Sequence, residues 1–292
     1  MSQDTVKKKT YQTKCTVTAI CNRKGGVGKS AVAINMARSL SQAKYRVLFL
    51  DLDPQADSTS LLCSKDPEEY REEGKTIVDL LLRKDAFWME FVVPTKYSDI
   101  SIIPSHSDLQ DTAILKARYH LPTLSLASRI THETLDGRYD YVMIDCPPNF
   151  EYFSELALAM SDFYLIPIHS GSKFALYGLK RLLDQVDDLR IEANPQLRAL
   201  GIVENHYDAR TMVCKEIDRQ LRLGYGNAVF KTQITNSTVQ QQAEVLSAPV
   251  MDHAPTGKLA GKYRLLRDEF LERVASGGLI IRGGGDGQKI AR

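Results

Sequence analysis

Short apolar runs alternate with longer amphipathic stretches along most of the chain. The runs cover residues 16–21, 45–50, 100–105, 141–145, 162–168, 200–203 and 230–234. Several are apolar throughout, as expected of parallel strands that are covered on both faces. Stretches between them repeat apolar residues at helical spacing. This alternation predicts one α/β domain with a doubly wound, mainly parallel sheet and helices on both faces.

The amphipathic stretches predict where the helices lie. The first has an apolar stripe made by Val32, Met36, Ala37, Leu40 and Ala43. Further helices are predicted at residues 56–62, 76–82, 121–135, 179–189 and 256–276, whereas the charged segment 64–75 is predicted to be a loop. Residues 1–14 and the glycine-rich residues 277–292 lack an apolar face, so we expect two flexible tails around a domain at 15–276.

Composition and charge narrow the protein class only in part. The 292 residues are 43% hydrophobic and 25% charged, which is ordinary for a globular domain. The net charge is only +2, so nucleic-acid binding would need a local basic patch. Lys7, Lys8 and Lys9 are either part of a solvated tail or a basic arm that touches DNA phosphates. No run reaches the length of a membrane span and no early apolar segment resembles a signal peptide, so we expect a cytoplasmic protein.

The cysteines and histidines give little sign of metal or disulfide chemistry. Five cysteines are scattered without a C-x-x-C pair: Cys15, Cys21, Cys63, Cys146 and Cys214. An odd, dispersed set is typical of reduced thiols. His169 follows a predicted strand with no cysteine or second histidine nearby in the sequence, so we predict a structural or surface role for it.

A glycine-rich loop between the first strand and the first helix carries the clearest chemical signal. It reads Arg23-Lys24-Gly25-Gly26-Val27-Gly28-Lys29-Ser30, and a helical pattern begins near Ala31. Glycines let successive backbone N–H groups turn toward an anion, the helix N-terminus adds partial positive charge, and lysine neutralises phosphate. The strand–loop–helix context therefore predicts a site for the phosphates of ATP or GTP. Its binding residues are Lys24, Gly25, Gly26, Val27, Gly28, Lys29, Ser30 and Ala31.

Two further segments place aspartates after apolar runs. Asp51-Leu52-Asp53-Pro54-Gln55 ends the second run, and Asp145-Cys146-Pro147-Pro148-Asn149 ends the run at 141–145. The carboxyl ends of parallel strands form one edge of the sheet, where α/β proteins bind ligands. A carboxylate near the γ-phosphate can orient the attacking water, and a strand-end aspartate can bind magnesium through water. The sequence thus predicts nucleotide hydrolysis.

These motifs resemble those of the ParA/MinD family of dimerising ATPases. The resemblance rests on Lys24 and on Arg23, which stands where the ordinary phosphate loop has glycine. It implies that Lys29 binds the β- and γ-phosphates of ATP and that Lys24 reaches the partner's nucleotide across a dimer interface. It also implies that Asp53 acts on the water, which makes Lys24, Lys29 and Asp53 the predicted catalytic residues. Magnesium would be held by Ser30, Asp51 and Asp145, partly through water.

The family resemblance implies a biological cycle as well as a site. ParA-type proteins form a homodimer with ATP, bind nonspecific DNA and are released when a ParB-type partner stimulates hydrolysis. We therefore expect a nucleoid-associated ATPase for plasmid or chromosome partition. Two alternatives are the same cycle acting on another protein cargo, and a nucleotide-gated scaffold or regulatory protein with incidental hydrolysis. No membrane partner is expected, because the tail lacks the amphipathic helix of MinD-like proteins.

The DNA-binding surface is the least defined part of the prediction. Arg210, in a segment that resembles the family's Tyr-Asp-x-Arg-Thr motif, is either part of this surface or a salt-bridged surface residue. The family's Pro-Arg-Asn and Glu-Ala-Pro-Ser are replaced by residues 235–238 and 240–244, so the arginines commonly used there are missing. The last helix carries a basic set that either compensates or forms a solvated face: Lys258, Lys262, Arg264 and Arg267.

Overall fold

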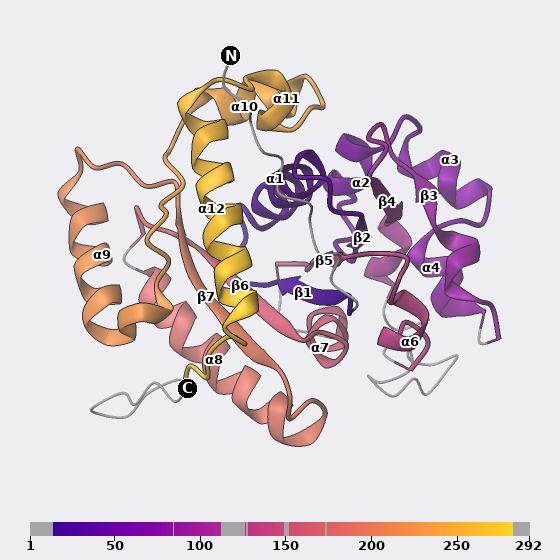
Figure 1. Ribbon diagram of the computed structural model, residues 1–292, viewed down its shortest axis with the longest axis horizontal. Helices are drawn as coiled ribbons and strands as arrows, with labels where there is room; N and C mark the ends of the chain where they lie inside the picture. The colour runs from indigo at the N-terminus through magenta and orange to yellow at the C-terminus, as the bar shows by residue number, and fades with distance from the viewer. Residues whose placement is uncertain are drawn as a thin grey trace, which may run out of the picture.

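The computed structural model describes residues 14–83, 85–111, 126, 128–148, 152–172 and 174–282. Its strands are β1 Thr16–Ile20, β2 Val47–Asp51, β3 Val93–Pro94, β4 Ile100–Ile103, β5 Tyr141–Asp145, β6 Phe163–His169 and β7 Arg198–Asn205. They form one seven-stranded sheet in the order β3-β4-β2-β5-β1-β6-β7 (Figure 1). Among the pairs that these described strands form, only β3–β4 is antiparallel. This confirms the predicted α/β class with a mainly parallel sheet.

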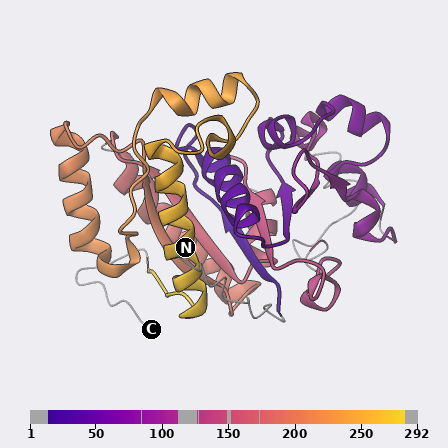
Figure 2. The same ribbon diagram turned by 45° about the horizontal axis from the view of Figure 1, so that its top comes forward.

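Helices cover both faces of this sheet. They are α1 Lys29–Gln42, α2 Asp57–Leu62, α3 Pro67–Glu72, α4 Ile77–Leu82, α6 His132–Leu135, α7 Tyr152–Ala159, α8 Phe174–Glu192, α9 Met212–Tyr225, α10 Thr238–Val245, α11 Val250–His253 and α12 Lys258–Ala275. Short 3₁₀ turns lie at η1 Trp88–Phe91, η2 Ser107–Gln110 and η3 Gly226–Ala228. Helices α1 and α12 lie side by side on one face, and α7 and α8 pack on the other (Figure 2).

Strand β5 shows why the predicted runs are apolar throughout. Val142 and Ile144 belong to the core beneath α7 and α8, whereas Tyr141 and Met143 belong to the core beneath α1 and α12. All four side chains are at most 2% exposed. Successive side chains of a strand point to opposite faces, so both must be apolar in a sheet that is covered twice. Burying each of them contributes about 1.5–3 kcal/mol.

The strand register brings the three predicted motifs to one edge. Asp145 is aligned with Ile20 of β1 on one side and with Asp51 of β2 on the other. The phosphate loop leaves β1 immediately after Ile20, so it starts level with both aspartates. Sheet pairing, rather than proximity in sequence, therefore assembles the site.

Two segments of the middle region differ from the sequence prediction. The predicted loop at 64–75 contains helix α3, which begins with Pro67 at its first position and is stabilised by reciprocal capping between Asp66 and Glu69. The predicted helix at 121–135 lies partly outside the described residues. Its described part forms a turn at 128–130 and then the four-residue helix α6.

The predicted strand at 230–234 is also not formed as such. The amides at its two ends donate to β7 carbonyls, at 2.8 and 2.9 Å. Between them, the amides of Lys231 and Thr232 donate to the carboxylate of Glu269 in α12, at 2.9 and 3.0 Å. The segment is therefore extended beside β7 but shares its hydrogen bonds between the strand and the helix.

Packing continues beyond the predicted end of the domain at Ser276. Leu279 exchanges two hydrogen bonds of 2.7 Å with Ala199 of β7, and Ile281 is 3% exposed. The beginning of the predicted tail is thus part of the folded domain. Residues 283–292 and the predicted tail at 1–13 lie outside the described residues.

Candidate functional site

The phosphate loop has the backbone shape that its glycines allow. Gly26 and Gly28 have φ of +70° and +82°, in the left-handed region that favours glycine. Gly28 caps the N-terminus of α1. A Cβ at position 28 would lie 2.1 Å from Nδ2 of Asn205, so a side chain is excluded by space as well as by conformation. Any residue other than glycine at 28 would displace the loop from the end of β7.

Two asparagines fix the loop to neighbouring strands. Nδ2 of Asn22 donates to the carbonyl of Pro167 in β6 at 2.7 Å, and its Oδ1 accepts from the amide of Lys24 at 3.0 Å. Nδ2 of Asn205, at the end of β7, donates to the carbonyl of Val27 at 2.9 Å. Neither role can be predicted from the sequence. The carbonyl of Pro167 and the side-chain amide of Asn205 are both far from the loop along the chain.

The two lysines of the loop occupy different environments. Lys29, the first residue of α1, is 5% exposed. Burial raises the pKa of the nearby carboxyls of Asp53 and Asp145, and the charge of Lys29 opposes this rise. Lys24 is exposed, and its Nζ donates to Oγ of Ser172 at 2.7 Å. Lys29 therefore lies among the site acids, whereas Lys24 lies at the surface.

Asp145 carries an unsatisfied carboxylate oxygen at the centre of the site. Its Oδ2 accepts from Oγ of Ser58 at 2.7 Å, whereas its buried Oδ1 accepts from no described residue. Burial raises the pKa of Asp145, and the hydroxyls of Ser58 and Ser30 oppose this shift. A buried oxygen without a donor fits a water of a hydrated magnesium ion, and Ser30 adds the hydroxyl beside it. Bound magnesium would neutralise phosphate charge.

Asp51 is held more tightly by the protein than the sequence suggested. Its carboxylate accepts three hydrogen bonds, from the amide of Asp53 at 3.1 Å and from the amide and hydroxyl of Thr59 at 2.9 and 2.7 Å. Burial and then Asp145 raise the pKa of Asp51 well above its usual range. The role predicted for Asp51 at magnesium stays a prediction.

The sequence prediction did not include Ser58 and Thr59. These two residues bind the carboxylates of the two buried aspartates, Asp145 and Asp51. Both lie in the short helix α2, which follows the Asp51–Gln55 motif. The sequence does contain one signal for these roles. Two hydroxyl residues stand at the start of a short helix that follows a pair of aspartates at a strand end. Their hydrogen bonds connect α2 to the ends of β2 and β5.

Asp53 lies at the inner wall of the site. It is 8% exposed, its Oδ1 accepts from the amide of Gln55 at 3.0 Å, and its carbonyl accepts from Oγ of Ser105 at 2.7 Å. Burial raises its pKa, and the Gln55 amide and Lys29 act against this. The carboxylate is thus oriented by the loop that carries it.

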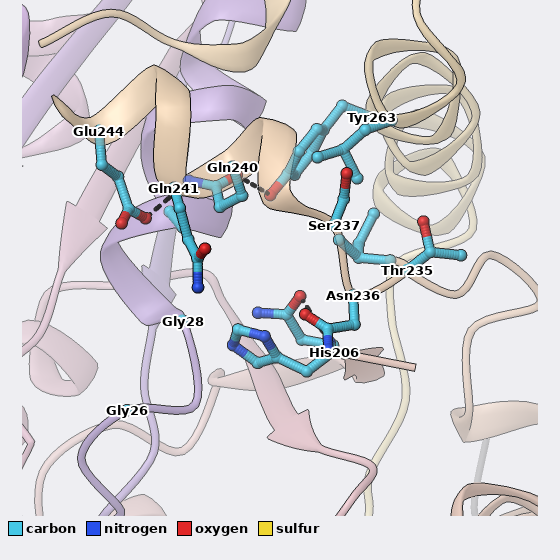
Figure 3. A pocket seen from close by; sticks show the side chains of 14 residues that line it. Gly26, Gly28, His206, Thr235, Asn236, Ser237, Gln240, Gln241, Glu244 and Tyr263 are labelled. Atoms are coloured by element: carbon cyan, nitrogen blue, oxygen red, sulfur yellow. Dashed lines mark hydrogen bonds between the residues drawn. The ribbon is translucent and has the colours of Figure 1, made fainter. Parts of the chain in front are cut away.

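Two adjoining cavities meet at the phosphate loop. The larger, about 490 Å³, is lined by the loop together with Asp53, Gln55 and Pro148. The smaller, about 270 Å³, lies between Gly26, Gly28 and the segment 234–244, with His206 at its floor (Figure 3). We call them the phosphate cavity and the side cavity.

The residues predicted to bind DNA do not form one uniform surface. Arg210 is 89% exposed and pairs with Asp208 at 2.7 Å. Lys258 is exposed and Lys262 is partly exposed, and Arg264 donates to the carbonyl of Pro255. The structure of Arg267 differs from the prediction of a solvent-facing side chain. Only 17% of its side chain is exposed, because it donates to the carbonyl of Ser39 in α1 and pairs with Asp268.

His169 and the cysteines have structural environments. The ring of His169 stacks on that of His206, with centroids 4.8 Å apart and planes at 23°. All five cysteines are buried and free, in agreement with the prediction, and burial raises the pKa of Cys21 to about 12. Among the described residues, no group of three or more histidine, cysteine or acidic side chains is arranged to bind a metal.

Sequence comparisons give the same result as the motifs. A family model described as an AAA domain matches residues 15–199. The chromosome-partitioning ATPase Soj of Thermus thermophilus is 32% identical over 259 residues, which cover 88% of this chain and 95% of Soj. The chromosome partitioning protein ParA of Caulobacter vibrioides is 29% identical over 235 residues, which cover 80% of this chain and 86% of ParA.

Solved structures share the fold. Cobyrinic acid a,c-diamide synthase of Mycobacterium smegmatis, solved with bound ADP and magnesium, superposes with a TM-score of 0.74 at 25% identity and covers 90% of this chain and 96% of its own. Within the described ranges, none of the helices combines the length and apolar character that a bilayer crossing requires. With about a third of its residues identical to those of Soj over most of both chains, the protein belongs to the ParA/MinD family of P-loop ATPases.

Proposed function

We propose that this protein is a partition-type ATPase that dimerises on ATP and is reset by hydrolysis. The observation that carries the proposal is the grouping of Lys29 and Asp53 in the lining of the phosphate cavity, with Asp145 buried beside them. Lys24 is exposed in the same loop, where its Nζ donates to the uncharged Ser172. The first three residues bind and hydrolyse the nucleotide. Lys24 is placed to interact with another molecule.

Each residue has one task in the proposed reaction. Lys29 and the amides of the loop bind the β- and γ-phosphates, and Asp53 orients the water that attacks the γ-phosphate. Burial raises the pKa of Asp53, and the Gln55 amide and Lys29 oppose this rise. The ionised carboxylate is the form that accepts a hydrogen bond from water. Asp145 and the hydroxyl of Ser30 would hold magnesium, and Ser58 fixes Asp145 by its hydrogen bond. The protein supplies mainly positioning and charge, as in other phosphoryl transfers.

The position of Lys24 supports the proposed dimerisation. Lys24 is exposed next to Gly25, which lines the phosphate cavity, and its present partner, Ser172, is uncharged. A second nucleotide brought to this face would offer phosphate oxygens, which attract an ammonium group more strongly than a hydroxyl does. ATP thereby contributes to the affinity between two copies.

The ATP-bound dimer is proposed to bind nonspecific DNA and to be released from it when a ParB-type partner stimulates hydrolysis. The relatives named chromosome-partitioning proteins support this choice. Arg210 and Lys258 are two of the exposed basic residues that support it. A second candidate is the same cycle on a protein cargo. It is favoured by α10, which has no lysine or arginine, and by Arg267, whose side chain is only 17% exposed.

Three measurements on the purified full chain test the proposal. We expect slow magnesium-dependent ATP hydrolysis, ATP-dependent dimers in light scattering, and salt-sensitive binding to a random-sequence DNA duplex only with ATP. ATP-driven dimers without DNA binding at any salt concentration would favour the protein-cargo candidate. Absence of both nucleotide binding and dimers would refute the proposed function.

A further inference from the structure

Helix α9 carries exposed apolar side chains that the proposed mechanism does not use. Met212 and Leu223, near its two ends, are 77% and 73% exposed. The helix lies at the outer margin of the molecule beyond β7 (Figure 1, Figure 2), and the two cavities are lined by residues of other elements. Single exposed apolar residues are ordinary, so the order in which these two occur with their neighbours decides what they indicate.

The outward side of α9 forms one straight stripe. Successive members are four, three and four residues apart, which places them within a sector of about 60° around the helix axis. All are exposed, and we call this set the α9 stripe: Met212, Glu216, Arg219 and Leu223. The opposite side of the helix is buried through Cys214, Ile217, Leu221 and Tyr225. The stripe therefore faces away from the rest of the chain.

The α9 stripe is complementary to itself when it is reversed. It reads apolar, acidic, basic, apolar in one direction and apolar, basic, acidic, apolar in the other. We propose that the stripe binds the α9 stripe of a second copy in antiparallel orientation. Met212 then lies against the partner's Leu223, and Glu216 lies against the partner's Arg219. Each copy uses the same surface, as in the isologous contacts of two-fold symmetric pairs.

The charges at the centre of the stripe select the antiparallel direction. Glu216 and Arg219 are both exposed and pair with each other at 2.6 Å within the chain. In the antiparallel pair, the four central charges of two copies alternate in sign. Parallel packing would instead place Glu216 against the partner's Glu216 and Arg219 against the partner's Arg219, which like-charge repulsion disfavours.

The α9 contact is small and goes beyond the function proposed above. The helix has 14 residues and is about 21 Å long, so one helix pair covers less than the about 1,600 Å² that a stable specific interface buries. The contact is therefore weak and transient between single copies, and it needs no nucleotide. Copies that are already joined by ATP carry two stripes, which raises the effective affinity of the contact.

Cysteine crosslinking without nucleotide tests the contact and its direction. Met212→Cys and Leu223→Cys are made separately in the full chain, whose five native thiols are buried, and treated with a short bis-maleimide. A mixture of the two variants should form crosslinked dimers, and either variant alone should not. Antiparallel packing sets identical positions about 16 Å apart along the helix axis. Leu265→Cys, at an exposed apolar position of α12, is the matched control and should not crosslink.

Charge reversal tests the centre of the stripe. Arg219→Glu in the Met212→Cys chain makes both central charges acidic, and Glu216→Arg in the Leu223→Cys chain makes both basic. Either reversed chain, mixed with the other cysteine variant unreversed, should crosslink about fivefold less, because one like-charged pair forms. The two reversed chains mixed together should recover the yield. This recovery separates a lost contact from a misfolded variant.

The outcomes distinguish the contact from the proposed function. No crosslink in the Met212→Cys and Leu223→Cys mixture at the highest soluble concentration would refute the α9 contact. Equal crosslinking of Met212→Cys alone or of the Leu265→Cys control would refute it as well, and so would two reversed chains that fail to recover the yield. Crosslinks in the mixture from a protein that forms no dimers with ATP would refute only the proposed function.

Discussion

Glu204 provides a test of how the end of β7 is held. This acid is 0% exposed, accepts from Oγ of Ser170 at 3.1 Å, and accepts from Nε2 of Gln233 at 2.7 Å. The same Nε2 also donates to Asp218 of α9 at 3.1 Å, and Arg222 lies 3.7 Å from Glu204. Two carboxylates therefore share one amide donor and one arginine beside the strand that ends in Asn205.

The structure gives the sign and the size of the expected effect. Burial and then Asp218 raise the pKa of Glu204 from 4.5 to about 7. At about 1.4 kcal/mol per pKa unit, ionising the folded protein costs up to about 3 kcal/mol, and we expect about 2 kcal/mol because Arg222 and solvent screen the charge. The folded state binds this proton more tightly than the unfolded chain. The resulting stability is complete below pH 4.5 and is lost as the pH rises through 7.

Glu204→Gln replaces the acid with a neutral group of the same shape. Its free energy of unfolding in urea should match that of the wild type at low pH and exceed it by about 2 kcal/mol above pH 8. Glu216→Gln, on the exposed face of α9, is the matched control. Arg219 lowers the pKa of Glu216 to about 2, so Glu216 does not titrate between pH 5 and 8. Wild-type and Glu204→Gln curves that run parallel with pH would refute the reasoning.

Three site variants extend the test to catalysis. Lys29→Ala should abolish detectable ATP binding in calorimetry, because its ammonium is the buried cation among the site acids; retained affinity would remove it from the phosphate site. Asp53→Ala should still bind ATP and dimerise but lose at least about a hundredfold in turnover, and normal phosphate release would contradict its role. Ser172→Ala frees Lys24 from its partner within the chain and should lower the ATP concentration needed for half-maximal dimerisation about two- to fivefold. The same change in a Lys24→Ala background should have no effect.

The sequence predicts those parts of the site whose function depends on residues that are close together in the chain. The phosphate loop needs glycines at defined positions, and Gly26 and Gly28 have the left-handed conformation that only glycine adopts easily. Asp53 and Asp145 follow apolar runs, and the sheet register explains why strand-end residues converge. Asp66, Pro67 and Glu69 are a local signal for the start of helix α3. The many charged residues of the segment favoured a loop prediction instead.

The residues that the sequence does not predict act over long separations. Ser58 holds Asp145 from 87 residues away, and Asn205 holds Val27 from 178 residues away. No short pattern contains both members of such a pair. The segment 230–234 fails for a related reason, because its strand-like composition cannot reveal that Glu269 binds two of its amides. The sequence likewise predicts Arg267 to be a surface charge. It cannot show that α12 packs on α1, where Arg267 donates to the carbonyl of Ser39.

Both margins of the sheet are closed against pairing with another copy. At one margin, β7 already pairs with Val229, Thr235 and Leu279 through isolated bridges at three points along or next to the strand. At the other, β3 has two residues, one of them Pro94, which has no amide hydrogen to donate. Among the described residues, neither margin therefore offers a long free strand edge on which another copy could extend the sheet. Assembly is left to side-chain surfaces, whose affinity a bound nucleotide can switch on and off.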